Sequence, residues 1–301
     1  MPTKILIDTD PGQDIDDLLA IWFALLRPEL DVRAITTVTW PSDKRARLVN
    51  RLLRFLGRSD IAVAAGMQYP LRPMGAHESA VKQDLGTLVN HYSFAMPEDP
   101  QDDPSGGGDA VDLIIRTVEA NAGDITLCCI APLTNIATAI CREPGIAKKI
   151  RQILLMGGET ALNRREHNIG YDYNASNIVM TSGVPIVMGT WDVTRRFVLS
   201  KDDCDAIGKH GELGAAMGRA IADWHPVQNW KPGPVMYDIF PIIHAYDQSY
   251  YTIDLKPVQV ETNAGPTRGM TVVSGDGPKI GVTTDIRADA VRDMYLKTIL
   301  G

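Results

Sequence analysis

The 301-residue sequence contains little cysteine, no surplus of positive charge and no long apolar run. Its four cysteines include no Cys-x-x-Cys pair, so a zinc site of that kind has no support. The formal net charge of −7 argues against a nucleic-acid-binding surface. No apolar run approaches the ~18 residues of a membrane span, and the N-terminus leads into a strand pattern without a signal peptide. We therefore expect a cytoplasmic protein without nucleic-acid or membrane partners.

A group of five aspartates near the N-terminus is the most prominent feature of the sequence. Residues 5–7 have the length and β-branched character of a buried strand. Pro11 and Gly12 end that strand in a turn, and an apolar helical pattern covers residues 18–26. The acids between them are Asp8, Asp10, Asp14, Asp16 and Asp17. They lie at the carboxyl end of a strand, where open parallel sheets bind ligands.

Five carboxylates this close repel one another and need a compensating partner. Asp14 or Asp16 could cap the following helix, which explains one or two of the acids but not all five. A hard cation such as Ca²⁺ or Mg²⁺ binds carboxylate oxygens and removes the repulsion. We therefore predict a metal site, with helix capping as the alternative.

Strand and helix patterns alternate through the first two thirds of the chain. This order predicts a single α/β domain over residues 1–301, with an open, mostly parallel, Rossmann-like sheet of six or more strands flanked by helices. The candidate strands cover residues 5–7, 32–38, 61–65, 125–130, 153–156 and 185–188. The intervening helices are expected at 18–26, 43–56, 110–120, from 132 onward, and 175–181. Residues 66–108 are irregular and are interpreted as a lid or binding loop, or as a disordered insertion.

The last third of the chain has a less regular pattern. Helices are expected over residues 202–208, 213–222, 237–246 and 288–300. Residues 224–234 are predicted to form a loop. Residues 258–261 and 269–273 predict a small C-terminal β-hairpin, with residues 280–283 as a third strand.

The aspartate motif and several later stretches share an order along the chain with one known family. The motif KILIDTDPGQDIDDLL is followed by APLTNIA (131–137), LLMGG (154–158), EHN (166–168), GTWDVT (189–194), YD (237–238) after GPVM, and VETNAGPTRGMTVV (260–273). Over nearly its whole length the sequence resembles the inosine-uridine-preferring nucleoside hydrolase family. The resemblance implies Ca²⁺-dependent hydrolysis of the N-glycosidic bond of ribonucleosides or related N-ribosides, and a homodimer or homotetramer.

The resemblance also implies a role for individual residues. Asp10 ligates Ca²⁺ and takes the proton from a metal-bound water. The other implied metal ligands are Asp17, Asp238 and the carbonyl oxygen of Ile130. The implied substrate contacts are Asp16 with a ribose hydroxyl, Glu166 and Asn168 with the sugar, and Met156 packing near it. A hard cation on carboxylates can bind sugar hydroxyls and orient a water for attack on an oxocarbenium-like centre.

Three departures from the family pattern leave assignments open. The first motif carries Gln13-Asp14-Ile15 where the family has one residue, so Asp14 could occupy a site given to Asp16 or Asp17. The loop at 39–43 replaces a usual Gly-Asn turn, so one sugar contact is lost or rebuilt. Tyr237 stands where the family often has a histidine that protonates the leaving base. Tyrosine is the weaker acid at neutral pH, so Tyr237 is either a catalytic acid or part of the pocket lining.

Other side chains are candidates for base contact. An aromatic ring can stack on a nucleobase, although packing is the default role. The aromatic candidates are Trp40, Trp224, His225 and Trp230. Arg164 and Arg165 are expected to be a solvated pair, with phosphate sensing as the alternative, and His167 is expected to pack or cap.

Two competing functions remain. A Mg²⁺ phosphohydrolase would use Asp8 as nucleophile and Asp10 as acid and base, but Gly12 and the Asp16-Asp17 pair do not fit its motif. A nucleoside- or ribose-binding protein of the same fold, catalytically impaired, is the non-enzymatic alternative, because a fold and a site do not guarantee activity.

Overall fold

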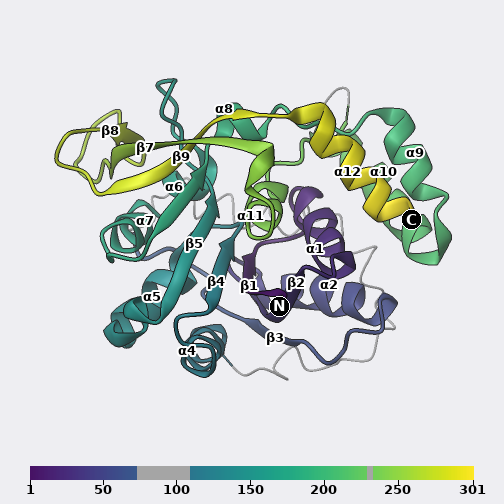
Figure 1. Ribbon diagram of the computed structural model, residues 1–301, viewed down its shortest axis with the longest axis horizontal. Coiled ribbons are helices and arrows are strands. Elements are labelled where there is room, and N and C mark those ends of the chain that lie inside the picture. The colour runs from purple at the N-terminus through teal and green to yellow at the C-terminus, as the bar shows by residue number, and fades with distance from the viewer. Residues whose placement is uncertain (73–108, 229–232) are drawn as a thin grey trace.

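The computed structural model describes residues 1–72, 109–228 and 233–301, with only the backbone described for residues 225–228. In this part of the chain nine strands form one sheet in the order β3-β2-β1-β4-β5-β6-β9-β7-β8 (Figure 1). The strands are β1 (Thr3–Thr9), β2 (Leu30–Thr37), β3 (Ala62–Ala65), β4 (Ile125–Cys129), β5 (Ile150–Met156), β6 (Ile186–Gly189), β7 (Tyr251–Val260), β8 (Thr271–Val273) and β9 (Lys279–Ile286).

The first six strands are mutually parallel, which confirms the predicted open α/β sheet. β7 and β8 form the predicted C-terminal hairpin. The third strand expected beside that hairpin is β9, which pairs antiparallel with β7; it also pairs in parallel with β6 and so joins the hairpin to the main sheet. The physical reason is burial, because Ile280 and Val282 of β9 pack into the main core.

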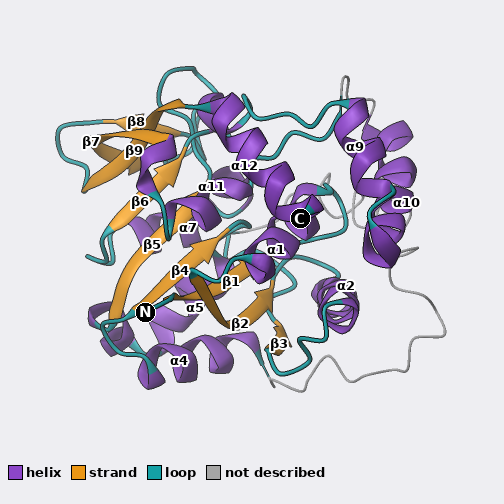
Figure 2. Ribbon diagram, turned by 45° about the vertical axis from the view of Figure 1, so that its right-hand side comes forward, coloured by secondary structure: helices purple, strands orange, loops and turns teal. Residues whose placement is uncertain are grey.

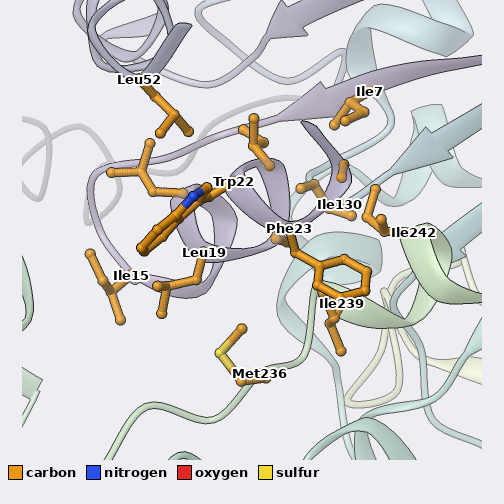
Figure 3. Close-up of a cluster of buried hydrophobic side chains, with 14 of the residues drawn as sticks. Ile7, Ile15, Leu19, Trp22, Phe23, Leu52, Ile130, Met236, Ile239 and Ile242 are labelled. Carbon is orange, nitrogen blue, oxygen red and sulfur yellow. The ribbon is translucent and has the colours of Figure 1, made fainter. Parts of the chain in front are cut away.

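Both faces of the sheet are buried, as the alternation along β1 shows. Ile5 and Ile7 point into one hydrophobic core, and Leu6 between them points into the other. The first core packs β1 against helix α1, where Leu19, Trp22 and Phe23 meet side chains of distant segments (Figure 3). A parallel sheet covered on both faces is the arrangement that continuous apolar strands require.

Helices lie on both sides of the sheet (Figure 2). The first core contains side chains of α1 (Asp16–Leu26), α2 (Ser42–Phe55), α8 (Trp191–Thr194), α9 (Lys201–Gly208), α10 (Gly211–Gln228), α11 (Ile239–His244) and α12 (Ala288–Leu300). The second core contains side chains of α4 (Ala110–Ala120), α5 (Thr134–Arg142), α6 (His167–Tyr171) and α7 (Tyr173–Met180). Two 3₁₀ helices, η3 (Pro144–Lys148) and η4 (Gln248–Tyr250), complete the described elements.

Two predictions for the connecting segments need correction. Residues 224–234 were expected to form a loop, but α10 continues to Gln228. Leu213, Met217 and Trp224 are buried on one face of α10, so packing extends the helix. Helix α6 was not predicted; the Glu166 side chain caps it by accepting hydrogen bonds from two main-chain N–H groups. Most of the long irregular stretch, residues 73–108, lies outside the described residues.

The strand order places a crevice beside β1. β2 and β3 lie on one side of β1, and β4 to β6 continue on the other, so the direction of winding reverses between β1 and β4. Loops that leave the carboxyl ends of strands at such a point diverge and leave room for a ligand. The aspartate motif follows β1, and Ile130 follows β4. Among the described helices, none is long and apolar enough to cross a membrane.

Candidate active site

A cavity of about 220 Å³ opens at this carboxyl edge of the sheet. The structure brings all ten site residues expected from the sequence to its wall. They are Asp10, Asp14, Asp16, Asp17, Ile130, Met156, Glu166, Asn168, Tyr237 and Asp238. Four further residues line it, namely Gln13, Arg164, His167 and Trp191.

Three buried carboxylates form a compact group in this cavity. Asp16 and Asp17 lie in the first turn of α1, and Asp238 directly precedes α11. One carboxylate oxygen from each lies within 4.8 Å of the others, close enough to share one cation. The group includes Asp16, which the resemblance implies contacts a ribose hydroxyl. It does not include Asp10, which the resemblance implies is a metal ligand.

Asp10 lies beside this acid group and is tied to it through the backbone. The main-chain N–H of Asp10 and the hydroxyl of Thr9 donate to Asp17 Oδ1 at 3.1 and 2.6 Å. Thr39 Oγ1, from the loop after β2, donates to Asp10 Oδ2 at 3.1 Å. In the loop where the family pattern has an asparagine, Thr39 therefore supplies a hydrogen bond to a site carboxylate. Its φ of 63° turns the chain tightly enough for that contact.

A buried arginine compensates part of the negative charge of the aspartate motif. Arg45 is 1% exposed and projects from α2 toward the aspartate turn. Its guanidinium donates to the main-chain carbonyl oxygens of Asp10 and Pro11, the latter at 2.9 Å, and reaches that of Trp40 at 3.4 Å. A buried guanidinium that satisfies three carbonyls holds the turn in shape while its charge offsets nearby carboxylates.

The acids hold protons more strongly than free aspartates do. Burial raises the pKa of Asp10 and Asp17 to about 7 and that of Asp14 to about 6, and the charge of Arg45 opposes the rise at Asp10. Burial, followed by repulsion from neighbouring acids, raises the pKa of Asp16 and Asp238 well above the usual range. Burial without enough positive charge is the common cause. The group is therefore suited to a divalent cation, which would favour the ionised forms.

Asp8 has a different environment from the other four aspartates of the motif. It is fully buried at the end of β1 and does not line the cavity. Thr36 Oγ1 and Asn135 Nδ2 donate to its Oδ1 at 2.6 and 2.8 Å. These contacts join β1 to β2 and α5. A buried carboxylate of this kind is a structural tie, so the nucleophile that a phosphohydrolase would need is not in the cavity.

Glu166 and Asn168 form the opposite wall through the cap of α6. Glu166 accepts from the main-chain N–H groups of Gly158, Asn168 and Ile169 at 2.9 to 3.0 Å. Asn168 Nδ2 donates to the carbonyl oxygen of Met156 at 3.1 Å. Because its amide nitrogen is used there, the Asn168 side chain can present its oxygen to a hydroxyl donor.

Aromatic and cationic side chains that were not predicted for the site complete the cavity. Trp191 follows β6, and the Arg164 guanidinium carbon lies 3.8 Å from its ring centre. Arg164 therefore belongs to the cavity wall and is also exposed, like Arg165, as expected for a solvated pair. The rule that ligands bind at the carboxyl ends of parallel strands could have found Trp191 from its position after a predicted strand.

Two of the four aromatic candidates for base contact, Trp40 and Trp224, are described by the structure and lie outside the cavity wall. Trp224 is 2% exposed within the first core and, like Trp40, is not part of the cavity wall. Trp230 and the side chain of His225 lie outside the described residues. His167, expected to pack or cap, lines the cavity, and its ring centre lies 6.0 Å from that of Tyr171.

Comparison with known proteins identifies the family. The inosine-uridine preferring nucleoside hydrolase family matches residues 5–293. The chain is 32% identical to the pyrimidine-specific ribonucleoside hydrolase RihA of Citrobacter koseri, over 99% of this chain and 98% of the relative. It is also 32% identical to RihA of Escherichia coli O9:H4, over 98% and 97%.

Solved structures agree with this relationship. A plant nucleoside hydrolase, PpNRh1, superimposes with a TM-score of 0.86 at 26% identity and complete coverage of both chains. A ribonucleoside hydrolase from Gardnerella vaginalis shares the fold, with a TM-score of 0.86 at 23% identity, covering 99% of this chain and 98% of that one. The resemblance drawn from the motifs and the prediction of an N-glycosidase are confirmed. The chain belongs to the inosine-uridine preferring nucleoside hydrolase family.

Proposed function

We propose that the protein hydrolyses the N-glycosidic bond of ribonucleosides to ribose and free base with Ca²⁺ as its cofactor. One observation carries the proposal beyond family membership. Three carboxylates, two from α1 and one from the residue before α11, lie within 4.8 Å of one another in a cavity that also contains Glu166 and Asn168. This combination offers a cation site and polar sugar contacts in one place.

The donor set fits a hard cation. Asp16, Asp17 and Asp238 are 2 to 5% exposed, and burial with mutual repulsion disfavours their charged forms. Oxygen ligands without nitrogen or sulfur favour Ca²⁺ or Mg²⁺ over transition metals. We assign the metal to Asp10, Asp17, Asp238 and the carbonyl oxygen of Ile130, with Asp16 close enough to take part. When bound, such an ion supplies charge that lowers the pKa of a water and orients the sugar hydroxyls.

Asp10 is the proposed general base. Its Oδ2 accepts a hydrogen bond from Thr39, and the charge of Arg45 lies nearby, so both favour the ionised carboxylate that a base requires. In its ionised form it takes a proton from the attacking water.

Side chains from several elements around the cavity hold the sugar in this proposal. Asp14 and Asp16 accept from ribose hydroxyls, the oxygen of Asn168 accepts from another, and Met156 packs against the ring. Glu166 is buried, and its ordered carboxylate faces positive charge that develops on the sugar as the bond to the base breaks.

Tyr237 is proposed to act at the base. Burial raises its pKa, with the carboxylates of Asp16 and Asp14 adding to the rise and a hydrogen bond from Trp191 opposing it. Its hydroxyl therefore stays protonated at neutral pH and donates a hydrogen bond to the leaving base. The dimer or tetramer and the cytoplasmic location expected from the resemblance remain predictions.

Release of reducing sugar from a panel of nucleosides, measured with Ca²⁺ and with a chelator, tests the proposal. Because the RihA relatives are named pyrimidine-specific, uridine and cytidine head the panel, followed by inosine and other purine nucleosides. Chelator-sensitive ribose release is the expected result. Absence of ribose, together with a melting temperature that a nucleoside raises only when Ca²⁺ is present, would favour the binding protein without turnover.

A further inference from the structure

Two arginines lie over the ring of Trp191 at the cavity wall. The guanidinium carbons of Arg164 and Arg195 lie 3.8 and 4.3 Å from its ring centre. A cation over an indole face is attracted by the negative π-surface, and the planar guanidinium stacks well there. Arg164, Trp191 and Tyr237 all line the cavity.

The two loops that carry this stack are bonded to each other. The main-chain N–H of Trp191 donates to the carbonyl oxygen of Gly158 at 3.0 Å. The buried Glu159 accepts from the main-chain N–H groups of Asp192 at 3.2 Å and Ala161 at 2.7 Å. These bonds connect the loop after β5, which carries Arg164, with the start of α8, which carries Trp191. The stack therefore rests on a fixed support.

Arg164 is an exposed cation among the described residues that line this carboxylate-rich cavity. Among the described residues it takes part in no ion pair with an acid. Its guanidinium lies over the face of the Trp191 ring. Stacking uses the face of the guanidinium and leaves the N–H donors in its plane available. An available, permanently charged donor in a ligand cavity calls for an electron-rich partner on the ligand.

We propose that Arg164, positioned by Trp191, is a catalytic residue that donates to the leaving base and stabilises the negative charge that develops on it. The inference rests on the proposed function and deepens it. Water adds to C1′ as the bond from C1′ to the base nitrogen breaks, and the water proton goes to Asp10. The bonding electron pair goes to the base, which Arg164 holds as an anion until it takes a proton from solvent. Trp191 is a positioning residue.

This role agrees with the neighbouring groups. Tyr237, on the same wall, offers a neutral hydroxyl, and Arg164 adds full positive charge beside it. A donor aimed at charge that forms only in the transition state accelerates the chemical step without requiring tighter ground-state binding. Recognition of an anionic substituent on the substrate, such as a 5′-phosphate, is the competing use of the same guanidinium.

Leaving-group dependence in the Ca²⁺-loaded enzyme separates these uses. The variants are Arg164→Met, which keeps length and packing on the indole, Arg164→Lys, which keeps charge, and Arg165→Met as the matched control. Arg165 is exposed, adjacent in sequence and absent from the cavity wall. The substrates are uridine, uridine 5′-monophosphate and p-nitrophenyl riboside, whose leaving group is a stable anion without assistance.

We expect Arg164→Met to lower kcat for uridine by about 100-fold and to leave p-nitrophenyl riboside within about twofold. Arg164→Lys should recover part of the loss, and Trp191→Leu should show a smaller loss with the same dependence on leaving group. Equal losses on uridine and on p-nitrophenyl riboside would overturn the proposal. So would a wild-type preference for the 5′-monophosphate that Arg164→Met abolishes. If the wild type cleaves neither riboside, the proposed function has failed; if it cleaves both and Arg164→Met matches it on both, only this inference has failed.

Discussion

The main-chain N–H of Asp238 donates to Asp16 Oδ2 at 3.2 Å, although 222 positions separate the two residues along the chain. The bond joins the start of α1 to the segment that enters α11. It places the Asp238 carboxylate beside those of Asp16 and Asp17. Because repulsion among these acids opposes folding, the stability of the metal-free protein and its affinity for metal are both expected to depend on the group.

Metal-free protein should lose stability as the pH rises from 5 to 8. Burial raises the pKa of Asp10 and Asp17 to about 7 in the folded state, and unfolded aspartates titrate near 3.9. Between these values the folded state holds more protons than the unfolded state, so the free energy of unfolding falls with pH. Melting temperatures measured with EGTA should decline over this range, and saturating Ca²⁺ should flatten the decline. A flat profile in EGTA would contradict the raised pKa values.

Single Asp→Asn variants should separate metal ligands from sugar contacts. Asp17→Asn and Asp238→Asn are expected to lower Ca²⁺ affinity by about 100-fold or more. Loss of a residue that only orients a ligand already costs about 10- to 100-fold in metal affinity, and loss of the ligand itself should cost more. Asp14→Asn should have a smaller effect on Ca²⁺ and raise KM. Isothermal titration of Ca²⁺ into each variant measures the difference. Asp60→Asn, at an exposed ion pair with Arg58, is the control. Full Ca²⁺ affinity in Asp17→Asn would show that the motif is aligned wrongly.

Asp10→Asn and Asp16→Asn should show which of the two aspartates is the metal ligand. The structure places Asp16 with the other acids, and the resemblance assigns the metal to Asp10. If Asp10 is both ligand and base, its variant should lose Ca²⁺ affinity and kcat together. Loss of kcat at unchanged Ca²⁺ affinity would assign Asp10 as a base alone and give the ligand position to Asp16.

Arg45→Met should destabilise the protein strongly. It removes a buried guanidinium that bonds the carbonyl oxygens of Asp10 and Pro11 and leaves those groups without their partner. Breaking a buried charged network of this kind costs about 3–5 kcal/mol in free energy of unfolding. Urea denaturation provides the measurement, and Arg47→Met, exposed on the same helix, provides the control. Equal midpoints for the two variants would show that Arg45 has no such role.

Thr39→Ala should shift the acidic limb of the pH–rate profile to higher pH. The Thr39 hydroxyl donates to Asp10 Oδ2 and thereby favours the ionised carboxylate. Without it the pKa of Asp10 rises further, and a higher pH is needed to produce the base. Profiles of kcat/KM for the wild type and Thr39→Ala give the shift, and Thr39→Ser, which keeps a hydroxyl, should restore the original limb. A shift shared by both variants would attribute the effect to the backbone instead.

Tyr237→Phe should lower turnover of a nucleoside with a poor leaving group by about tenfold, the effect of one lost hydrogen bond. Because burial raises the pKa of Tyr237, the wild-type profile should show no limb from its ionisation below pH 9. Unchanged turnover in Tyr237→Phe would leave Tyr237 as pocket lining only.

The aspartate motif and the six parallel strands could be predicted from local information in the sequence, whereas the ten residues expected at the site were assigned through the family resemblance. Residues 5–7 form a strand because of their apolar and β-branched character. Pro11 and Gly12 end that strand in a turn whatever the tertiary contacts are. The parallel order of strands then brings Ile130 and the aspartates to one edge of the sheet. The ordered motifs carried the remaining site residues, including Tyr237 and Asp238.

Tertiary structure alone decided which of those residues meet. The distance between Asp16 and Asp238 depends on how α11 packs against α1, and no local pattern encodes that contact. The same holds for the contact of Trp191 with Arg164, which comes from the loop after β5, and for Trp224, which packing retains inside α10. Local sequence therefore determined the elements and the chemical types at the site. Long-range packing determined which carboxylates lie close together and which guanidinium lines the cavity with them, because those contacts form between elements that are distant in the chain.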